Sequence, residues 1–168
     1  MVMISNPIIT KNRIFNDARG SFLKIAHKEF FLNFKKNIKI KQFNISVTKK
    51  RGTIRGMHLQ KSNFSEIKIV TCLKGKIFDT VVDLRKNKNF GKKKKFILDS
   101  PNKSLIVPEG FAHGFQTLTD NCIVIYLHTN YYKKNFEKTL NPLKLGINWP
   151  IKKIIISKKD KNGEIIQI

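Results

Sequence analysis

The sequence predicts a single all-β domain. Its 168 residues suit one domain, and a hydrophobic content of 40% is enough to form a core. Thirteen Phe residues and many Ile and Val favour strands, because aromatic and β-branched side chains suit a pleated, half-buried surface. Short apolar runs recur between clusters of Gly, Pro, Asn and Lys, a spacing typical of a β-sandwich or barrel.

The expected strands share apolar or alternating side chains and end at turn-forming residues. In chain order they are residues 22–26, 38–48, 53–59, 67–73, 76–84, 96–98, 104–107, 114–118 and 122–130. We expect a short helix over residues 27–34, and Lys74-Gly75 predicts a hairpin turn between two strands. Residues 154–156 are strand-like, and the polar tail after them predicts by itself a frayed end.

The charge of the chain is strongly positive, with 34 Lys and Arg against 11 Asp and Glu and a formal net charge of +23. Taken alone, that balance indicates an anionic partner such as nucleic acid or a membrane surface. Most of the basic residues are Lys accompanied by many Asn and Ile, however, and an AT-rich coding sequence produces the same mixture. The Lys run at residues 92–95 predicts a solvated turn and strand edge.

The cysteines and the start of the chain point to a cytoplasmic protein. Cys72 and Cys122 lie in apolar runs without C-x-x-C spacing, so we expect buried, reduced thiols and no metal knuckle or redox pair. No apolar stretch approaches the ~20 residues that cross a bilayer. Residues 1–10 also lack a positive region followed by an apolar core, so we expect no signal peptide.

Arg55 and His58 lie three residues apart in an expected strand, where regular alternation puts side chains on opposite faces. Gly56 between them permits a bulge that brings both onto one face. In one interpretation, Arg55 and His58 together line a functional site. An exposed Arg and an ordinary core His is the other.

Residues 108–115 concentrate Pro, Gly and His between two strands. A turn there would deliver His113 to the mouth of a strand, where functional residues often lie. A plain structural turn explains the same residues. Histidines near strands also raise the question of a metal site, but the H-x-H spacing common in such sites is absent, so we expect none.

Two polar side chains interrupt apolar strands. Alternation puts Lys68 on one face with Val70 and Cys72, and a Lys that faces the interior must have a partner. A Lys at a sheet edge, with its ammonium in water, is the alternative. Tyr126 shares a face with His128, so its hydroxyl is either a proton donor in a site or that of a core tyrosine.

Taken together and in this order, the segments resemble the dTDP-4-dehydrorhamnose 3,5-epimerase family over most of the chain. The early patterns are D-x-R-G-x-F at residues 17–22, Q-x-N-x-S at 42–46 and R-G-x-x-R-G-x-H-x-Q at 51–60. The later ones are Lys68 with its apolar neighbours, the D…D-x-R strand at 79–85, P-x-G-F-A-H-G-F at 108–115, the tyrosines at 126 and 131–132, I-N-W-P at 147–150 and S-K-K-D at 157–160.

The resemblance implies a cupin-type double-stranded β-helix, which is a jelly-roll sandwich, with short peripheral helices over residues 1–168 and a homodimeric assembly. It implies epimerisation at C3, C5 or both of a dTDP-4-keto-6-deoxyhexose, as in dTDP-rhamnose and cell-surface polysaccharide synthesis. The expected partner is the nucleotide sugar, with no nucleic acid and no membrane, and the chemistry requires neither a metal nor a redox cofactor.

The family's roles carry over to matching positions. His58 would be the general base, hydrogen-bonded by Asp160, while Tyr126 would return a proton from the opposite face. Lys68 would meet the C4 oxygen, where charge develops in the transition state. Other matching positions would line the substrate or its diphosphate: Gln42, Asn44, Arg55, His113, Glu137 and Lys159. Arg19 would reach across a dimer interface into the partner's site.

Two other functions fit parts of the sequence. A non-catalytic cupin could bind nucleic acid or another polyanion through its Lys-rich surface, with affinity that falls steeply with salt. A sugar-nucleotide 3,4-ketoisomerase could use the same scaffold to move the ketone. Product analysis separates that isomerase from an epimerase.

Overall fold

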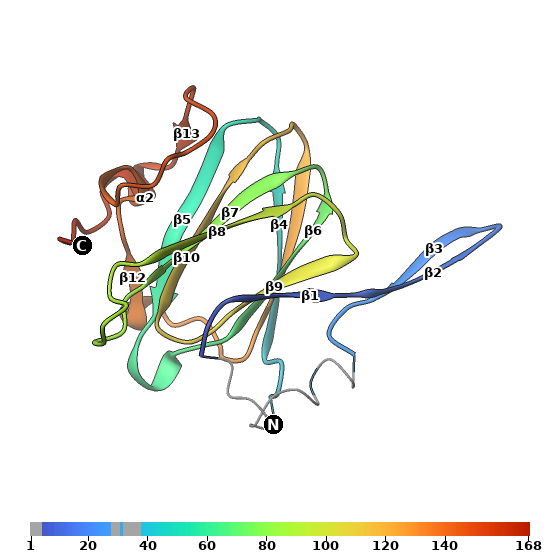
Figure 1. The fold of residues 1–168 in the computed structure, drawn as a ribbon, viewed down its shortest axis with the longest axis horizontal. Coiled ribbons are helices and arrows are strands. Elements are labelled where there is room, and N and C mark those ends of the chain that lie inside the picture. Colours follow the sequence, from blue (N-terminus) through green and yellow to red (C-terminus); the bar gives the residue numbers. More distant parts are fainter. Residues whose placement is uncertain (1–4, 28–30, 32–37) are drawn as a thin grey trace.

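The protein, seen here as a computed structural model that describes residues 5–27, 31 and 38–168, is a jelly-roll sandwich of two facing sheets (Figure 1). The predicted all-β class is confirmed. The first sheet has the strand order β1 (Ile8–Lys11), β9 (Lys103–Val107), β6 (Lys68–Lys74), β11 (Cys122–His128) and β4 (Gln42–Thr48). The second has the order β12 (Glu137–Thr139), β5 (Thr53–Gln60), β10 (Phe111–Thr117), β7 (Ile77–Asp83) and β8 (Lys93–Leu98), and β13 (Ile155–Ile156) pairs with β5.

The helical elements are short and peripheral, as expected. Three 3-10 turns and one helix are described: Ser62–Phe64, Lys134–Phe136, Pro142–Lys144 and α2 (Lys158–Lys161). The helix expected over residues 27–34 lies outside the described residues except for 27 and 31, so it stays a prediction. In the described part of the chain, no helix is long and apolar enough to cross a membrane.

The main core lies between the two sheets, because it draws buried side chains from both. Val70 on β6 and Val124 on β11 belong to the same cluster as Val81 on β7 and Phe115 on β10. The two-residue alternation of strands explains this, since the apolar partners i and i+2 all point inward. At one end of this interior the inward positions become polar, and there the pocket forms.

A second apolar cluster lies on the outer face of the second sheet, where the C-terminal segment covers β5, β7 and β10. Trp149 packs edge-on against Phe78, with ring centroids 5.8 Å apart, and its indole N–H donates to the Pro142 carbonyl at 3.1 Å. The polar tail after residue 156 is also held against the sandwich, because Asp160 is 4% exposed, Glu164 bridges Leu140 and Ile166 packs against this cluster. The prediction of a frayed end, which was based on the polarity of this segment, is wrong.

The connection at Lys74-Gly75 is not a hairpin turn, which corrects the sequence prediction. β6 pairs with β9 and β11, whereas the next strand, β7, pairs with β8 and β10, so the chain passes from one sheet to the other there. A Gly with φ of +84° suits any sharp change of direction, and its sequence signal does not say which strands pair.

A two-stranded arm, β2 (Arg13–Asp17) paired with β3 (Gly20–Lys24), projects away from the sandwich (Figure 1). Its Phe15 and Phe22 are 50% and 63% exposed although both are aromatic. Among the described residues, none of β2 or β3 belongs to a core cluster, so burial imposes no alternating pattern from which β2 could be predicted.

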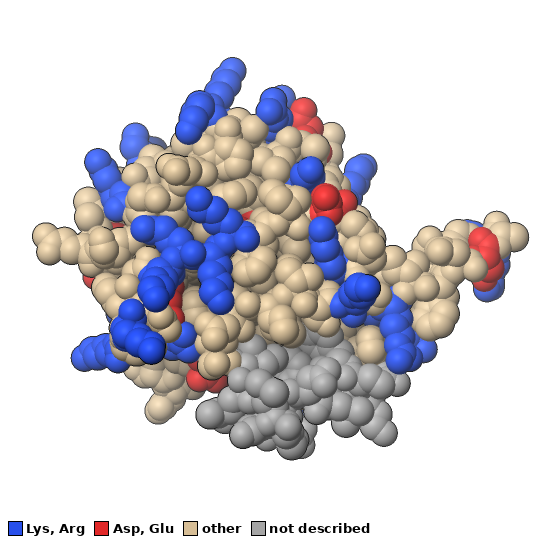
Figure 2. All heavy atoms as spheres, viewed as in Figure 1, with Lys and Arg blue, Asp and Glu red and all other residues tan. Residues whose placement is uncertain are grey.

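The Lys run of residues 92–95 lies where expected, because β8 is the edge strand of its sheet. Charged side chains at an edge hinder pairing with another chain. Figure 2 shows Lys and Arg spread over the visible face with few acidic residues among them, rather than gathered into one stripe.

Candidate active site

A cavity of about 620 Å³ opens between the two sheets. β4, β6 and β11 form one wall, β5 and β10 the other, and residues 155–160 close one side. Most of the site residues expected from the sequence line it: Asn44, Arg55, His58, Lys68, His113, Tyr126, Glu137, Lys159 and Asp160.

The β5 wall depends on an irregularity in the strand. His113 on β10 lies opposite His58, but Phe115 lies opposite Arg55, so β5 contributes one extra residue between these pairs. Arg55 and His58 consequently both face the pocket, as the expected bulge predicted, while Met57 is buried in the outer cluster. Gly56 has a φ of +115°, and a Cβ there would meet the Gly114 Cα at 2.6 Å, so only glycine fits.

His58 and Asp160 form a close pair across two layers of the fold. His58 Nε2 lies 2.7 Å from Asp160 Oδ1, and Asp160 Oδ2 accepts the Gly56 backbone N–H at 3.1 Å. Asp160 sits on α2, which begins at the capping residue Ser157, whose Oγ accepts the Asp160 N–H. Because the carboxylate accepts from Nε2–H, the lone pair on His58 Nδ1 is the one available to take a proton.

The charge state of Asp160 follows from its surroundings. Burial alone would raise the pKa of Asp160, but the hydrogen bond and charge of His58 and the Gly56 N–H outweigh it, so its pKa lies below the usual range. Asp160 is ionised because its pKa is lowered, and at 4% exposure its side chain is held in place by its neighbours. An ionised partner of this kind fixes the orientation and the tautomer of an imidazole.

Lys68 faces the interior, so the edge-strand alternative for this residue is wrong. Its ammonium donates to the His58 carbonyl oxygen at 3.1 Å and lies 3.4 Å from Glu66 Oε1. The Lys68 side chain is 10% exposed and that of Glu66 is 6% exposed, so the charged pair is largely shielded from water. The ammonium is thus anchored to the backbone of the residue that carries the candidate base.

Tyr126 enters the pocket from β11, on the sheet opposite to that of His58. Its ring stacks on His128 with centroids 6.1 Å apart and meets His113 edge-on at 6.3 Å. Burial, with the Asp79 carboxylate adding to it, raises the pKa of Tyr126 well above its usual range. The phenol therefore stays protonated at neutral pH and can act as a donor.

His113 is buried and paired with Asp79, whose two oxygens lie 2.9 and 3.0 Å from its Nε2. Burial raises the pKa of Asp79, and His113 opposes that rise. The pair fixes the ring of His113 between Tyr126 and the floor of the pocket.

Charged groups surround the pocket entrance. Lys159 Nζ binds Glu137 Oε2 at 2.6 Å, and the Tyr132 hydroxyl donates to the same oxygen at 3.0 Å. Burial opposes the charge of Glu137, but Lys159 and neighbouring groups keep its pKa below the usual value. Arg55 donates through Nε to the Thr48 hydroxyl at 3.0 Å, which holds its guanidinium at the β4 side.

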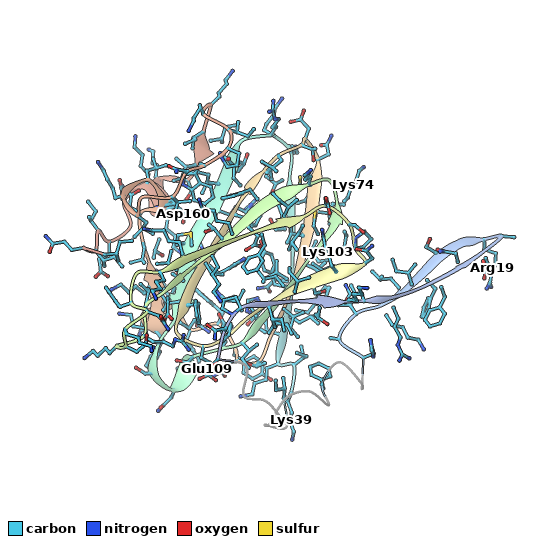
Figure 3. All side chains as sticks on the ribbon, in the orientation of Figure 1. Arg19, Lys39, Lys74, Lys103, Glu109 and Asp160 are labelled. Carbon is cyan, nitrogen blue, oxygen red and sulfur yellow. The ribbon has the colours of Figure 1, made fainter. Side chains whose placement is uncertain are left out.

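Two expected residues do not line the pocket. Gln42 does not line it but contacts two residues that do: its amide donates to Asn44 Oδ1 at 3.1 Å, and its Oε1 accepts the Tyr132 backbone N–H at 2.8 Å. Arg19 lies at the tip of the β2–β3 arm, where it binds Asp17 at 2.6 Å and is 90% exposed, far from Asp160 in Figure 3.

The structure also places residues in the site to which the sequence analysis gave no role, among them Ser46, Glu66, His128 and Tyr132. The alternation of β11 had already put His128 on the face of Tyr126. Glu66 precedes its strand and had no local signal. Among the described residues, no group of three or more His, Cys, Asp or Glu is placed to hold a metal ion.

In this arrangement the imidazole of His58 on one sheet faces the phenol of Tyr126 on the other, and the Lys68 ammonium is fixed beside the residue that carries the imidazole. Moving a proton on a carbon next to a carbonyl requires such a base, such an acid and stabilisation of the enolate oxygen. Fold and site therefore define a jelly-roll enzyme of the isomerase class.

The chain matches known epimerases of nucleotide-linked sugars. The family model described as dTDP-4-dehydrorhamnose 3,5-epimerase matches residues 2–167. A dTDP-4-dehydrorhamnose 3,5-epimerase of Shigella flexneri is 34% identical over 166 residues, which cover 96% of this chain and 91% of that protein. The chain belongs to the dTDP-4-dehydrorhamnose 3,5-epimerase family.

Solved structures of this family have the same fold. The dTDP-4-dehydrorhamnose 3,5-epimerase of Bacillus anthracis, crystallised with TDP and PPi bound, superposes with a TM-score of 0.89 at 32% identity, covering 99% of this chain and 97% of that one. A dTDP-6-deoxy-D-glucose-3,5-epimerase of Legionella pneumophila, in complex with dTDP-4-keto-L-rhamnose, gives a TM-score of 0.87 at 30% identity, with 95% and 87% covered.

Proposed function

We propose that this protein epimerises C3, C5 or both of a dTDP-4-keto-6-deoxyhexose, with residues 1–168 acting as one domain. The observation that carries the proposal is the placement of the His58–Asp160 pair on one wall of the pocket and Tyr126 on the other. Inverting a stereocentre needs a base on one face of the sugar and an acid on the other.

In the first step, His58 Nδ1 takes the proton from the carbon next to the ketone. The C–H bonding electrons move into a C=C bond, and the ketone electrons move onto the C4 oxygen. Lys68 stabilises that oxygen, because its ammonium is already fixed beside His58 and does not have to reorient as the charge develops. Asp160 stabilises the resulting imidazolium.

In the second step, the Tyr126 hydroxyl gives its proton to the opposite face of the carbon. The enolate collapses back to the ketone, and the centre is inverted. The raised pKa of Tyr126 makes the tyrosinate costly, so Tyr126 recovers a proton from water, and the His58 imidazolium releases its proton to water, before the next turnover. Label from solvent would enter the product in the same process.

The remaining pocket groups bind the nucleotide sugar in this proposal. Arg55 and Lys159 supply positive charge for the diphosphate, since guanidinium and ammonium groups bind phosphate oxygens strongly. Asn44, His113 and Glu137 contact the sugar or nucleotide, and Gln42 supports Asn44 from behind.

We propose further that the enzyme is a homodimer in which Arg19 reaches the partner's pocket. The arm that carries Arg19 projects into solvent with Phe15 and Phe22 exposed. The outward positions of the edge strand β4 are also apolar, with Phe43, Ile45 and Val47 53–60% exposed. Exposed apolar surface along an unpaired edge is typical of an interface.

The location we propose is the cytoplasm. Cys72 and Cys122 are both free and buried, as expected, which suits a compartment that keeps thiols reduced. Burial raises the pKa of the Cys72 thiol to about 12, so it stays protonated and unreactive. Cell fractionation with an antibody to the protein tests the location.

The decisive experiment is deuterium incorporation followed by NMR, with the purified protein and dTDP-4-keto-6-deoxyglucose in heavy water. Label at C3 and C5 with inversion establishes the 3,5-epimerase, and label at one carbon establishes a single-site epimerase. A product with the ketone moved would identify a ketoisomerase instead. An Arg19→Ala variant that keeps full turnover at the dimer's molecular mass would rule out the shared site.

A further inference from the structure

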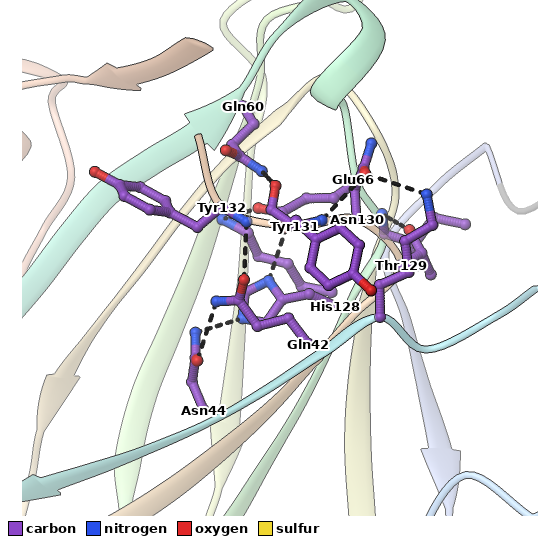
Figure 4. A network of polar contacts seen from close by, with 12 residues as sticks. Gln42, Asn44, Gln60, Glu66, His128, Thr129, Asn130, Tyr131 and Tyr132 are labelled. Atoms are coloured by element: carbon purple, nitrogen blue, oxygen red, sulfur yellow. Dashed lines mark hydrogen bonds and ion pairs between the residues drawn. The ribbon is translucent and has the colours of Figure 1, made fainter. Parts of the chain in front are cut away.

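A continuous row of polar side chains crosses the pocket wall formed by β4, β11 and β6. It comprises Gln42, Asn44, His128, Glu66 and Lys68, and we refer to it as the polar row. Figure 4 shows its first four members. His128 lies directly opposite Gln42 on β4 and directly opposite Lys68 on β6, so strand register alone brings these three together. The proposed function uses Lys68, Gln42 and Asn44 but gives no role to Glu66 or His128.

The donor and acceptor of each hydrogen bond in the polar row follow from the contact at its Gln42 end. The backbone N–H of Tyr132 can only donate, so the Gln42 atom that it meets at 2.8 Å is the carbonyl Oε1. The Gln42 amide nitrogen then donates to Asn44 Oδ1 at 3.1 Å. This leaves the Asn44 amide nitrogen, which only donates, facing His128 Nε2 at 3.1 Å.

The protonation of His128 follows from this order. Nε2 must accept from Asn44, so the ring proton is on Nδ1 and the imidazole is neutral. Nδ1–H then donates to Glu66 Oε2 at 2.8 Å. The stacked contact with Tyr126 holds the plane of the His128 ring in the orientation that both hydrogen bonds require.

Glu66 is the point where the polar row meets the catalytic cation. Burial would raise the pKa of Glu66, but the His128 hydrogen bond and the Lys68 charge outweigh it, so its pKa lies below the ordinary value. Its other oxygen, Oε1, lies 3.4 Å from Lys68 Nζ. Glu66 is therefore the negative charge that balances Lys68 inside the wall.

The geometry points to Glu66 and His128 as positioning residues, which together hold the Lys68 ammonium beside His58 for enolate stabilisation. This inference rests on the proposed function of Lys68. The inference requires a neutral His128. An imidazolium would be a second cation beside Glu66 and would compete with Lys68 for its charge. It would also present an Nε2–H donor to the Asn44 amide, which is itself a donor. The backbone N–H of Tyr132 thus sets the orientation of a catalytic group on the far side of the wall.

The first test is independent of turnover. Long-range proton–nitrogen NMR of the uniformly ¹⁵N-labelled protein reports the tautomer of each histidine, and the resonances missing in a His128→Asn variant assign those of His128. We expect a protonated Nδ1 and an unprotonated Nε2 at neutral pH. An Nε2–H tautomer or an imidazolium would overturn the inference.

The second test separates positioning from binding. In the deuterium assay, Glu66→Gln should lower kcat with little change in KM, by about tenfold, which is less than the ~100-fold cost of removing a transition-state donor itself. His128→Asn retains an amide donor near the place of Nδ1 and should keep most of kcat. His128→Gln places its amide near Nε2, loses the donor to Glu66 and should resemble Glu66→Gln.

A matched control is Glu164→Gln, which neutralises a carboxylate paired with Lys138 at 2.7 Å outside the pocket. Its kcat should equal that of the wild type. A Glu66→Gln variant with wild-type kcat, or His128→Asn as impaired as His128→Gln, would refute the positioning role. If the wild type exchanges no deuterium at all, the proposed function fails, and the tautomer measurement still accepts or rejects the hydrogen-bond order.

Discussion

Replacing Asp160 with Asn removes the charge that orients His58 while leaving the shape of the side chain. If the Asn oxygen faced His58 Nε2, its amide nitrogen would face the Gly56 N–H, and two donors would meet where Oδ2 now accepts at 3.1 Å. If the amide nitrogen faced Nε2 instead, His58 would have to hold its proton on Nδ1, and the lone pair that acts as the base would be lost. Either arrangement impairs proton abstraction.

The size of the effect follows from the 2.7 Å hydrogen bond. Hydrogen bonds to charged groups contribute about 1.5–3 kcal/mol. The bond strengthens as the imidazolium forms, so most of that energy is lost from the transition state. At about 1.4 kcal/mol for each tenfold change in rate, kcat should fall roughly 10- to 150-fold.

The assay is the initial rate of deuterium incorporation at C3 and C5 at saturating substrate, with circular dichroism to confirm the fold. Asp120→Asn is the matched control, because Asp120 also accepts a backbone N–H, that of Arg51 at 2.6 Å, but lies outside the pocket. An Asp160→Asn variant that is folded and exchanges deuterium as fast as the Asp120→Asn variant would refute the role of the pair.

Three further predictions come from the same geometry. Tyr126→Phe should slow formation of the inverted product more than exchange of the first proton, because only the return step needs the hydroxyl; an unchanged ratio of inversion to exchange would remove Tyr126 as the acid. Gly114→Ala should destabilise the fold by about 1–3 kcal/mol in denaturant unfolding, since the new Cβ would lie 2.8 Å from the Arg55 carbonyl oxygen and 2.6 Å from the Met57 sulfur, and a wild-type midpoint would contradict that clash. The pKa values of Asp160 and Glu66 are lowered on folding, so their contribution to stability is present above their ordinary values of 3.8 and 4.5 and is lost as the pH falls through the lower folded values. The melting temperature should therefore drop on acidification below about pH 4.5, and less so in Glu66→Gln; equal slopes would be the contrary result.

Local pattern was enough to predict much of the pocket wall. Alternation grouped Lys68 with Val70 and Tyr126 with His128, and left open whether those faces belonged to a site. Gly56 indicated the bulge that turns Arg55 and His58 to one side. These inferences succeeded because each depends on residues within one strand, where the period of two is fixed by backbone geometry.

Pairings between distant residues could not be predicted in this way. Asp160 is 102 residues from His58, and only the family resemblance suggested their contact. Glu66 and His128 are 62 residues apart and were not paired at all. The turn at Lys74-Gly75 was misassigned for the same reason, because the partner of a strand is chosen by the packing of the whole sandwich.

The short helix α2 has consequences for the behaviour of the enzyme on warming. Only Asp160 of its four residues is buried. The helix is held by the Ser157 cap, by the Asn141 amide, which donates to the Lys161 carbonyl at 2.6 Å, and by the side-chain contacts of Lys159 and Asp160 described above. Such a segment opens at a lower free-energy cost than the strands of the core. Turnover should then decline reversibly while the sandwich is still intact, so the calorimetric melting point overstates the temperature range in which the protein works.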